Sequence, residues 1–321
     1  SSNFNQWVNT WFPQDNNNLK IENISHMFEN SMFDSKLSDW NLKSVTDASY
    51  CFKDTGYNGY LESWFNNKGG TKTFTIQNIK GMFEGSAFNN RLANWDVTTV
   101  TDASDLFKNN TSYDKWIMNW FKQPANGGKT WAIETLAGMF EGANAFNQKL
   151  SNWDLTTVKD LSRMFKDNTK YNQFIKPWFP ERVNASTPES RGDAPAAVEH
   201  LDEMFAGNTA FNQKINTWDV RAVKTASGMF KDNTKFTQFL GTWFDTTSGP
   251  QTFALEDASS MFEGSIYNNN LSKWNMNTVK NASRMFANTT EFDQYIEPWF
   301  QKDGSTISHA VENVSGIFTG A

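Results

Sequence analysis

The sequence predicts a repeat solenoid in which short parallel β-strands stack along one face and turns or short helical segments lie opposite. A two-residue anchor, a hydrophobic residue followed by Phe, recurs throughout the 321 residues. The segments between anchors also repeat, as in "MFEGSAFNNRLANWDVTTVTDAS" from Met82 and "MFEGANAFNQKLSNWDLTTVKDLS" from Met139. One copy is too short to bury its own aromatic side chains, so the copies are expected to stack and share a continuous core.

The anchors divide the chain into copies of the repeat, which we call rungs. The anchor pairs are Met27-Phe28, Cys51-Phe52, Met82-Phe83, Leu106-Phe107, Met139-Phe140, Met164-Phe165, Met204-Phe205, Met229-Phe230, Met261-Phe262, Met285-Phe286 and Ile317-Phe318. Their spacing alternates between 24 or 25 residues and 31 to 40 residues, which defines short A rungs and longer B rungs. We predict a single continuous domain over 1–321. It comprises a partial rung 1–26, the two-rung repeats 27–81, 82–138, 139–203, 204–260 and 261–316, and a partial rung 317–321.

Each rung carries an aromatic residue followed in most copies by Asn or Asp, then an aliphatic or aromatic residue and then Trp. A Trp in the same place in every rung favours a core position over a sugar-binding platform, although the Trp-Phe pairs of B rungs are expected to be the more exposed ones. The alternating segment "VTDASDLF" at 100–107 predicts a strand. The polar residues after the A-rung Trp favour Asx turns over a calcium-binding ladder; they are Asn41, Asp96, Asp154, Asp219 and Asn275.

One charged column follows the anchor Phe. It reads Glu29, Lys53, Glu84, Lys108, Glu141 and Lys166, and then Ala206, Lys231, Glu263 and Ala287. Stacking would place Glu beside Lys in consecutive rungs. Exposed pairs of this kind stabilise only weakly, but a slip by one rung would place like charges together, so the column favours one register.

Composition excludes several functional classes. The net charge of −6 offers no basic footprint for nucleic acid. The single cysteine, Cys51, excludes an internal disulfide and a Cys-based zinc site. No apolar run is long enough to cross a membrane. His26, His200 and His309 fall in different rungs, and no phosphate-binding or nucleophile motif is present. We therefore expect a protein that is not an enzyme and that has no catalytic residues, cofactor or metal.

The stretch "MFEGANAFNQKLSNWDLTTVKDLSRMF", from Met139 to Phe165, resembles the BspA-like repeat of bacterial surface proteins and mycoplasma lipoproteins. The A rungs match closely, whereas the B rungs add an insert. The resemblance implies a leucine-rich-repeat-like fold, an extracellular or cell-surface location, and a role in adhesion. It supplies no catalytic residues. The cysteine of a lipoprotein anchor is absent from this sequence.

The inserts of the B rungs are candidate ligand-binding loops. They follow Phe65, Phe121, Phe179, Phe244 and Phe300 and vary in length and composition. Inserts of this kind map to one face of a repeat array, often the binding face. The longest contains Arg191, Gly192 and Asp193, an integrin-binding tripeptide that is also short enough to occur by chance. An adhesin, or a module that binds a host or cell-surface protein or glycan, is therefore one candidate function.

The two partial rungs suggest a second function. The first begins "SSNFNQWVNTWF" and the last reads "VENVSGIFTGA". When the end of the chain is joined to its start, the combined segment keeps the anchor pair and the aromatic-Asn, aromatic and Trp-Phe positions of "MFKDNTKYNQFIKPWF" at 164–179. The combined segment is one residue longer. We therefore expect a head-to-tail homopolymer, a heterologous contact that forms a filament. The alternative is that the sequence was trimmed from a longer array, although an arbitrary cut would rarely leave ends so nearly complementary. The predicted interface comprises Phe4, Trp7, Trp11, Phe12, Val314, Ile317 and Phe318. Neither nucleic acid nor membrane insertion is expected.

Overall fold

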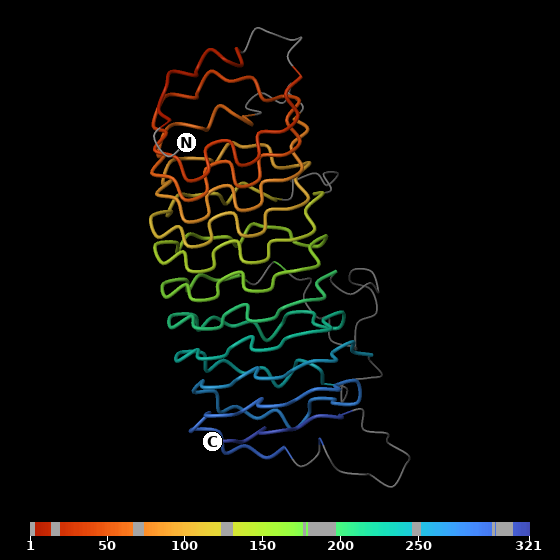
Figure 1. Cartoon of the computed structure of the whole chain (residues 1–321). Helices are drawn as coiled ribbons and strands as arrows, with labels where there is room; N and C mark the ends of the chain where they lie inside the picture. Colours follow the sequence, from red (N-terminus) through yellow and green to blue (C-terminus); the bar gives the residue numbers. More distant parts are fainter. Residues whose placement is uncertain are drawn as a thin grey trace.

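The computed structural model describes residues 4–13, 20–66, 74–122, 131–175, 178, 197–245, 252–296, 299 and 311–321. The chain runs in successive turns that stack along one axis, and the two termini lie at opposite ends of the stack (Figure 1). Backbone hydrogen bonds join equivalent residues of consecutive rungs, so each turn of the stack corresponds to one rung of the sequence.

The predicted leucine-rich-repeat-like solenoid of stacked β-strands is wrong. Within the described ranges there is no α-helix, no sheet and no strand longer than one bridged residue; only Trp178 and Trp299 have 3₁₀ geometry. One residue per rung pairs in a parallel ladder that is a single residue wide: Asn23, Asp47, Asn78, Asp102, Thr135, Asp160, His200, Thr225, Asp257, Asn281 and Asn313. Isolated antiparallel bridges join Pro13 to Trp40, Asn66 to Trp95, Lys122 to Trp153 and Asp245 to Trp274. Stacked turns therefore form the walls of this structure.

Left-handed backbone geometry explains the absence of strands. In every rung the residue directly before the anchor pair and the residue two after its Phe have positive φ. These residues are Gly138 (φ 64°) and Gly142 (φ 63°) in one A rung, and Asp105 and Asn109 (both φ 54°) in a B rung. Positive φ bends the chain sharply and is easiest for Gly and tolerable for Asn and Asp. The strand expected at 100–107 is therefore reduced to one bridged residue, Asp102.

The amides around each anchor pair alternate between two kinds of hydrogen bond. In the first described rung, the Met27 amide donates to the Ile24 carbonyl of the same rung at 3.4 Å. The Phe28 amide donates to the Cys51 carbonyl of the next rung at 2.9 Å. Around the anchors, every bond between rungs runs from an amide of the earlier rung to a carbonyl of the later one. Ahead of each anchor segment the direction is reversed, as when the Thr46 and Asp47 amides donate to the Glu22 carbonyl, so the N-to-C direction is a property of the anchor segments.

The core consists of aromatic rings stacked in columns. The anchor rings of Phe83 and Phe107 lie 5.6 Å apart and are nearly parallel, with 9° between their planes. Trp95 and Trp120 form part of a second column, with their ring centroids 6.1 Å apart. Most of the buried indoles are also held by a hydrogen bond, as when Trp120 Nε1 donates to the Leu92 carbonyl of the preceding rung at 3.0 Å. The same bond recurs at Trp40, Trp64, Trp95, Trp153, Trp178, Trp243, Trp274 and Trp299.

The core position predicted for the Trp column is confirmed, but the greater exposure expected for the B-rung Trp-Phe pairs is wrong. Trp120 and Phe121 are buried, and so are the Trp-Phe pairs at 64–65 and 243–244. The physical reason is that the Phe packs edge-on against the next A-rung Trp. Phe121, for example, lies 5.1 Å from Trp153 with the two rings perpendicular. The Trp-Phe pair is therefore buried between its own rung and the next one.

The predicted Asx turns are confirmed, and the charged column is confirmed at three steps from a B rung to the next A rung. Asp96 Oδ1 accepts the Thr98 amide at 3.1 Å in an Asx turn, and the same bond occurs at Asn41, Asp154, Asp219 and Asn275. In the charged column, Lys53 lies 3.3 Å from Glu84 of the next rung. The equivalent pairs are Lys108–Glu141 at 3.3 Å and Lys231–Glu263 at 3.4 Å. These contacts repeat only when the rungs are in this register.

Two neighbouring tryptophans test the contribution of the stacked column. Trp120→Phe removes the indole hydrogen bond, leaves the Leu92 carbonyl without its donor and creates a small cavity, so the free energy of unfolding should fall by about 2 kcal/mol. Trp116 in the same rung is 45% exposed. Trp116→Phe should therefore change stability by less than about 0.5 kcal/mol. Denaturant titration measures both, and equal effects would contradict the column.

The pair formed by Glu263 and Arg284 predicts a pH dependence. Arg284 Nη2 donates to Glu263 Oε1 at 2.6 Å, and this bond lowers the pKa of Glu263 from 4.5 to about 2. Because the folded-state pKa lies below the ordinary value, the stabilisation is fully present above about pH 4.5 and disappears as the pH falls towards 2. Glu263→Gln should therefore destabilise the protein at pH 7, with a difference from wild type that narrows between pH 4.5 and 2.

Thermal unfolding across this pH range measures the narrowing. The exposed Glu134, which lies 3.3 Å from Lys159, provides the matched control. Glu134→Gln should have almost no effect at any pH, because a solvent-exposed ion pair contributes little. A constant difference between Glu263→Gln and wild type from pH 7 to 2 would contradict the assignment.

Candidate assembly interface

The first face of the stack is formed partly by a half-rung, residues 4–13. The half-rung lies in register on the first full rung: the Phe4 and Phe33 rings stack 6.2 Å apart, and Phe12 packs edge-on against Trp40 at 4.5 Å. The Asp34 amide donates to Asn5 Oδ1 at 3.1 Å. The half-rung thus repeats the contacts that B rungs make throughout the stack.

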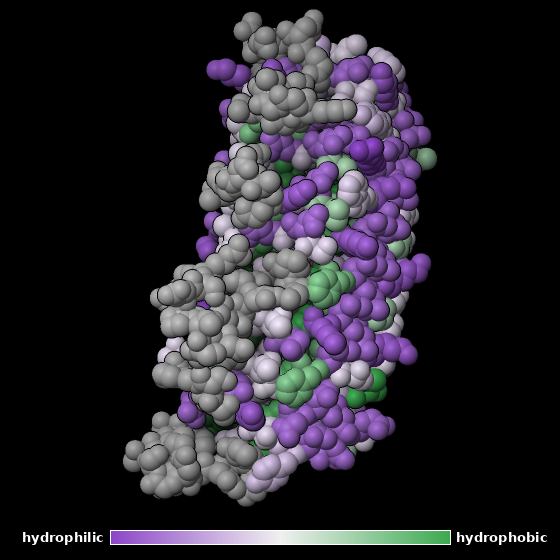
Figure 2. Space-filling view, turned by 180° about the vertical axis from the view of Figure 1, so that it is seen from behind, coloured by the Kyte–Doolittle hydropathy of each residue, from purple (hydrophilic) through white to green (hydrophobic). Residues whose placement is uncertain are grey.

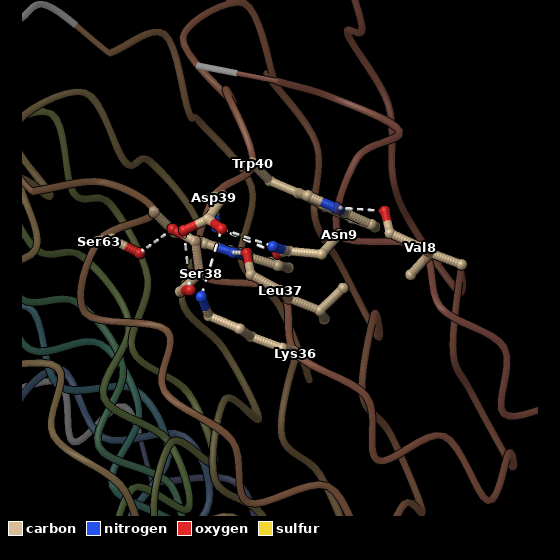
Figure 3. Close-up of polar contacts among 9 residues, drawn as sticks. Val8, Asn9, Lys36, Leu37, Ser38, Asp39, Trp40 and Ser63 are labelled. Atoms are coloured by element: carbon tan, nitrogen blue, oxygen red, sulfur yellow. Dashed lines mark hydrogen bonds and ion pairs between the residues drawn. The ribbon is translucent and has the colours of Figure 1, made fainter.

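Asn9 fastens this half-rung to the rung below it (Figure 3). Its side-chain Nδ2 donates to Asp39 Oδ2 at 2.5 Å, and its Oδ1 accepts the Asp39 amide at 3.3 Å. Trp40 Nε1 donates to the Val8 carbonyl at 2.9 Å. Hydrogen bonds from Asn9, Ser38 and Lys36, in that order, hold the pKa of Asp39 below its ordinary value. The half-rung is therefore a fixed part of the fold.

Beside the half-rung, the first anchor segment exposes a row of hydrogen-bond acceptors. In later rungs the carbonyls at the equivalent positions accept amides from the rung before, but the carbonyls of Asn23, Ser25, Met27 and Glu29 accept from no described residue. Phe28 itself is buried. This face therefore offers backbone acceptors, with the exposed rings of Trp7 and Trp11 on the half-rung beside them.

The opposite face, formed by residues 313–321, exposes the matching donors. The amides of Val314, Gly316, Phe318 and Gly320 donate to no described residue, whereas their counterparts one rung earlier all bond to this rung. The bond from Ala282 to the Asn313 carbonyl, at 2.8 Å, is the first of these. The last rung therefore presents four amides, at every second residue, in the positions from which earlier rungs bond to the next rung.

An exposed ring accompanies these donors. Phe318 stacks on Phe286 with the centroids 5.8 Å apart and 12° between the planes, which continues the anchor column. Its other side faces outward, because Phe318 is 45% exposed. Val314 is also exposed, at 42%. This face thus combines a polar row with apolar side chains.

The direction of the hydrogen bonds around the anchors makes the two faces complementary. Donors on the last rung would meet acceptors on the first rung of another copy, in the pattern that joins rungs within the chain. Two identical faces would instead bring amide against amide or carbonyl against carbonyl. The two faces therefore expose opposite hydrogen-bonding groups beside their anchors.

The structure places the predicted interface residues on or beside these faces. Ile317, like Phe4 and Phe12, is partly buried against the core, whereas Trp7, Trp11, Val314 and Phe318 are exposed. The candidate loop residues Arg191, Gly192 and Asp193 lie outside the described residues. The rows of free amides and carbonyls were missed from the sequence, because backbone hydrogen-bond direction leaves no mark on residue identity.

No other reactive centre emerges from the described part of the chain. There, no cluster of three or more His, Cys, Asp or Glu side chains is arranged to hold a metal ion. Cys51 is buried, and burial raises the pKa of its thiol well above the usual value. The same ranges contain no helix with the length and apolar character needed to cross a membrane. The absence of enzymatic activity stays a prediction.

Comparison with known proteins supports the repeat organisation. The family model described as "Mycoplasma protein of unknown function, DUF285" matches residues 65–126, 121–187, 194–299 and 250–321, which together exceed half of the chain. The chain belongs to the DUF285 family. The overlapping matches identify it as a repeat protein. No curated protein and no solved structure matches this DUF285 chain.

A pair of proline substitutions tests whether the last row of amides is free. Val314→Pro removes an amide that has no partner in the described chain, so the free energy of unfolding of the isolated DUF285 chain should change by less than about 0.5 kcal/mol. Ala282→Pro removes the equivalent amide one rung earlier together with its bond to Asn313. It should destabilise by about 3 kcal/mol. Denaturant titration at low protein concentration compares the two.

Proposed function

We propose that this protein is a non-enzymatic structural protein that assembles head to tail into a surface fibre or filament. The observation that carries the proposal is the pairing of the two end faces: four amides of 313–321 and four carbonyls of 23–29 have no hydrogen-bond partner among the described residues. The bond pattern within the chain sets the register of the junction. Val314, Gly316, Phe318 and Gly320 of one copy would donate to Asn23, Ser25, Met27 and Glu29 of the next.

Apolar contacts support the same junction. The register places Phe318 against the anchor pair Met27-Phe28 of the next copy, so that the anchor column continues from one chain to the other. Phe28 and Trp299 are already buried within the chain. The newly buried apolar area would therefore come mainly from Phe318, Val314 and Trp11. Each square ångström removed from water contributes about 25 cal/mol, and each backbone hydrogen bond adds about 1 kcal/mol.

The resemblance of the A rungs to BspA-like repeats supports the proposed setting. Repeats of that kind belong to bacterial surface proteins, so we propose an extracellular or cell-surface location. The DUF285 match itself specifies repetition and no activity. Adhesion through the B-rung inserts is an accessory role compatible with the fibre.

A mixing experiment tests the direction of assembly. Phe318→Asp should disable the last face and Trp11→Asp the first, because each places a charge where a ring would be buried. Each variant alone should remain a monomer, whereas an equimolar mixture should form dimers that do not grow, because each dimer joins the two intact faces. The Ile266→Asp variant, changed at an exposed residue on the long side of the stack, should polymerise like wild type.

Light scattering and negative-stain microscopy of the 321-residue chain measure these species. Wild type should show polymers that lengthen with concentration. Dimers formed by either variant alone would indicate a symmetric contact and overturn the proposal, as would a wild-type chain that stays monomeric at all concentrations. Deletion of 311–321 is a weaker test, since it exposes the equivalent donors of the rung before.

A further inference from the structure

One exposed column of the stack alternates between aromatic and basic side chains. It lies three residues after the core aromatic of each rung. The B-type positions are all aromatic, and four of the five A-rung positions are Lys or Arg. We call this column the aromatic–basic stripe, and its members in order are Trp7, Lys36, Tyr60, Arg91, Trp116, Lys149, Phe174, Lys214, Phe239, Asn270 and Tyr295.

The aromatic members are exposed in a protein whose other rings are mostly buried. Their exposed fractions lie between 45% for Trp116 and 62% for Trp7. Large exposed rings at one repeated position mark a contact surface more strongly than scattered ones. Figure 2 shows separate hydrophobic patches along one side of the stack, with hydrophilic side chains between and beside them. The position was missed from the sequence although its signal is present there: the residue type alternates strictly with rung type.

A ladder of side-chain amides lies beside the stripe, two residues earlier in each rung. Asn58 Oδ1 accepts the Asn89 amide at 2.8 Å, and Asn89 Oδ1 accepts the Asp114 amide at 3.1 Å. The ladder continues through the Asp114 carboxylate, which accepts the Asn147 amide, and then through Asn147, Asn172 and Asn212 to the Thr237 amide. The Nδ2 groups of Asn58 and Asn89 donate to no described residue, and neither do those of Asn147 and Asn172. The stripe therefore borders a rigid row that retains hydrogen-bond donors.

At least one aromatic member packs closely against the backbone. A Cβ added to Gly241 would come within 2.3 Å of the Phe239 ring, so the ring rests directly on the backbone there. Phe239 is nevertheless 48% exposed, so part of its ring is open to a ligand. Such a ring forms a platform on which the apolar face of a planar or chair-shaped ligand can stack.

The middle of the stripe carries its free cations. Lys149 and Lys214 are exposed and form no ion pair or hydrogen bond with a described residue, and they lie in the rungs on either side of Phe174. Two other basic members are paired: Arg91 lies 3.1 Å from Glu62, and Lys36 lies 3.3 Å from Asp39. The segment from Trp116 to Phe239 thus alternates three open rings with two available positive charges.

The spacing matches a ligand with a two-unit repeat. In the adjacent core column the rings of Tyr113, Phe146 and Tyr171 follow one another at 6.2 and 6.0 Å. One rung step is therefore comparable to one sugar unit of an extended polysaccharide, and one A-plus-B repeat is comparable to a disaccharide. A ring in every second rung would stack on one sugar of each disaccharide, and the cation in the rung between would pair with a charge on the other sugar.

We propose that the aromatic–basic stripe binds a linear acidic polysaccharide in which every second sugar carries a carboxylate. The uncharged sugars stack on Trp116, Phe174 and Phe239, and the carboxylates of the intervening sugars pair with Lys149 and Lys214. The amide ladder donates hydrogen bonds to sugar hydroxyls. The proposed contacts lie between Trp116 and Phe239, in the middle of the stack, so they involve none of the residues of the end faces.

Charge and geometry favour a polysaccharide over single-stranded nucleic acid. A nucleic acid carries one phosphate per nucleotide and is bound through a continuous basic groove. The stripe has one charge for every second rung, on a chain with a net charge of −6. Its charge density therefore fits one carboxylate per disaccharide.

Titration calorimetry with hyaluronan oligosaccharides that span five rungs tests the proposal, with chito-oligosaccharides of equal length as the neutral comparison. Wild type should bind hyaluronan at least tenfold more tightly than the neutral chain, and the affinity should fall with added salt. Phe174→Ala with Phe239→Ala should weaken binding about tenfold by removing two stacking platforms. Phe239→Tyr keeps a platform and should bind like wild type.

Lysine substitutions separate specific charge pairing from net charge. Lys149→Ser with Lys214→Ser should weaken hyaluronan binding about tenfold and reduce its salt dependence. The matched control is Lys170→Ser with Lys235→Ser, which removes two exposed charges from the rungs of Phe174 and Phe239 outside the stripe. It should leave binding within twofold of wild type. Unfolding curves of all variants should coincide, since every altered side chain is exposed.

The remaining outcomes overturn the proposal. These are equal affinity for the neutral chain, tighter binding of a single-stranded oligonucleotide of similar length, equal losses in the two lysine pairs, or no binding of hyaluronan. The Phe318→Asp chain should bind hyaluronan like wild type, per chain. Failure of assembly and failure of polysaccharide binding are therefore read separately.

Discussion

The left-handed residues on either side of each anchor pair constrain the rest of this structure. They turn the chain twice within a few residues, so that the anchor Phe points into the core and amides on both sides point along the stack axis. Glycine holds these positions in several rungs, but Asp, Asn and even Arg163, with φ 58°, hold them in others. An L-residue in this region costs about 1–2 kcal/mol. The cross-rung hydrogen bonds and stacked rings must offset that cost in every rung.

Given these turns, the core is built around flat side chains stacked in columns. Each rung has room for about three rings, and rings pack at the spacing of the rungs with little loss of contact. Aliphatic residues such as Leu92 and Ile117 fill the space between the ring columns, and their carbonyls receive the indole hydrogen bonds. This explains why a chain with 15% aromatic residues can bury its core without helices or sheets in its described part.

The sequence predicted the rungs, their register and the polar columns, because all of these depend on residue identity repeating at fixed positions. The Asx turns after Trp95 and the pair between Lys53 and Glu84 follow directly from the template. The predicted strands were wrong because alternation over 100–107 has the period of a strand, while the positive φ of Asp105 is not evident from an aspartate. At the end faces, exposed rings such as Phe318 could be predicted, whereas the direction of the backbone bonds could not.

The antiparallel bridges affect how the insert sequences of such a protein can vary. Asn66 is bridged to Trp95, so the chain is fixed to the stack just before 67–73, and it is buried again at Phe74. Equivalent bridges hold Lys122 and Asp245 to the stack just before two other inserts. A segment tethered at both ends to a rigid frame can lengthen, shorten or change composition without shifting the rungs on either side. The frame can thus present varied sequences at regular intervals while its own geometry stays constant.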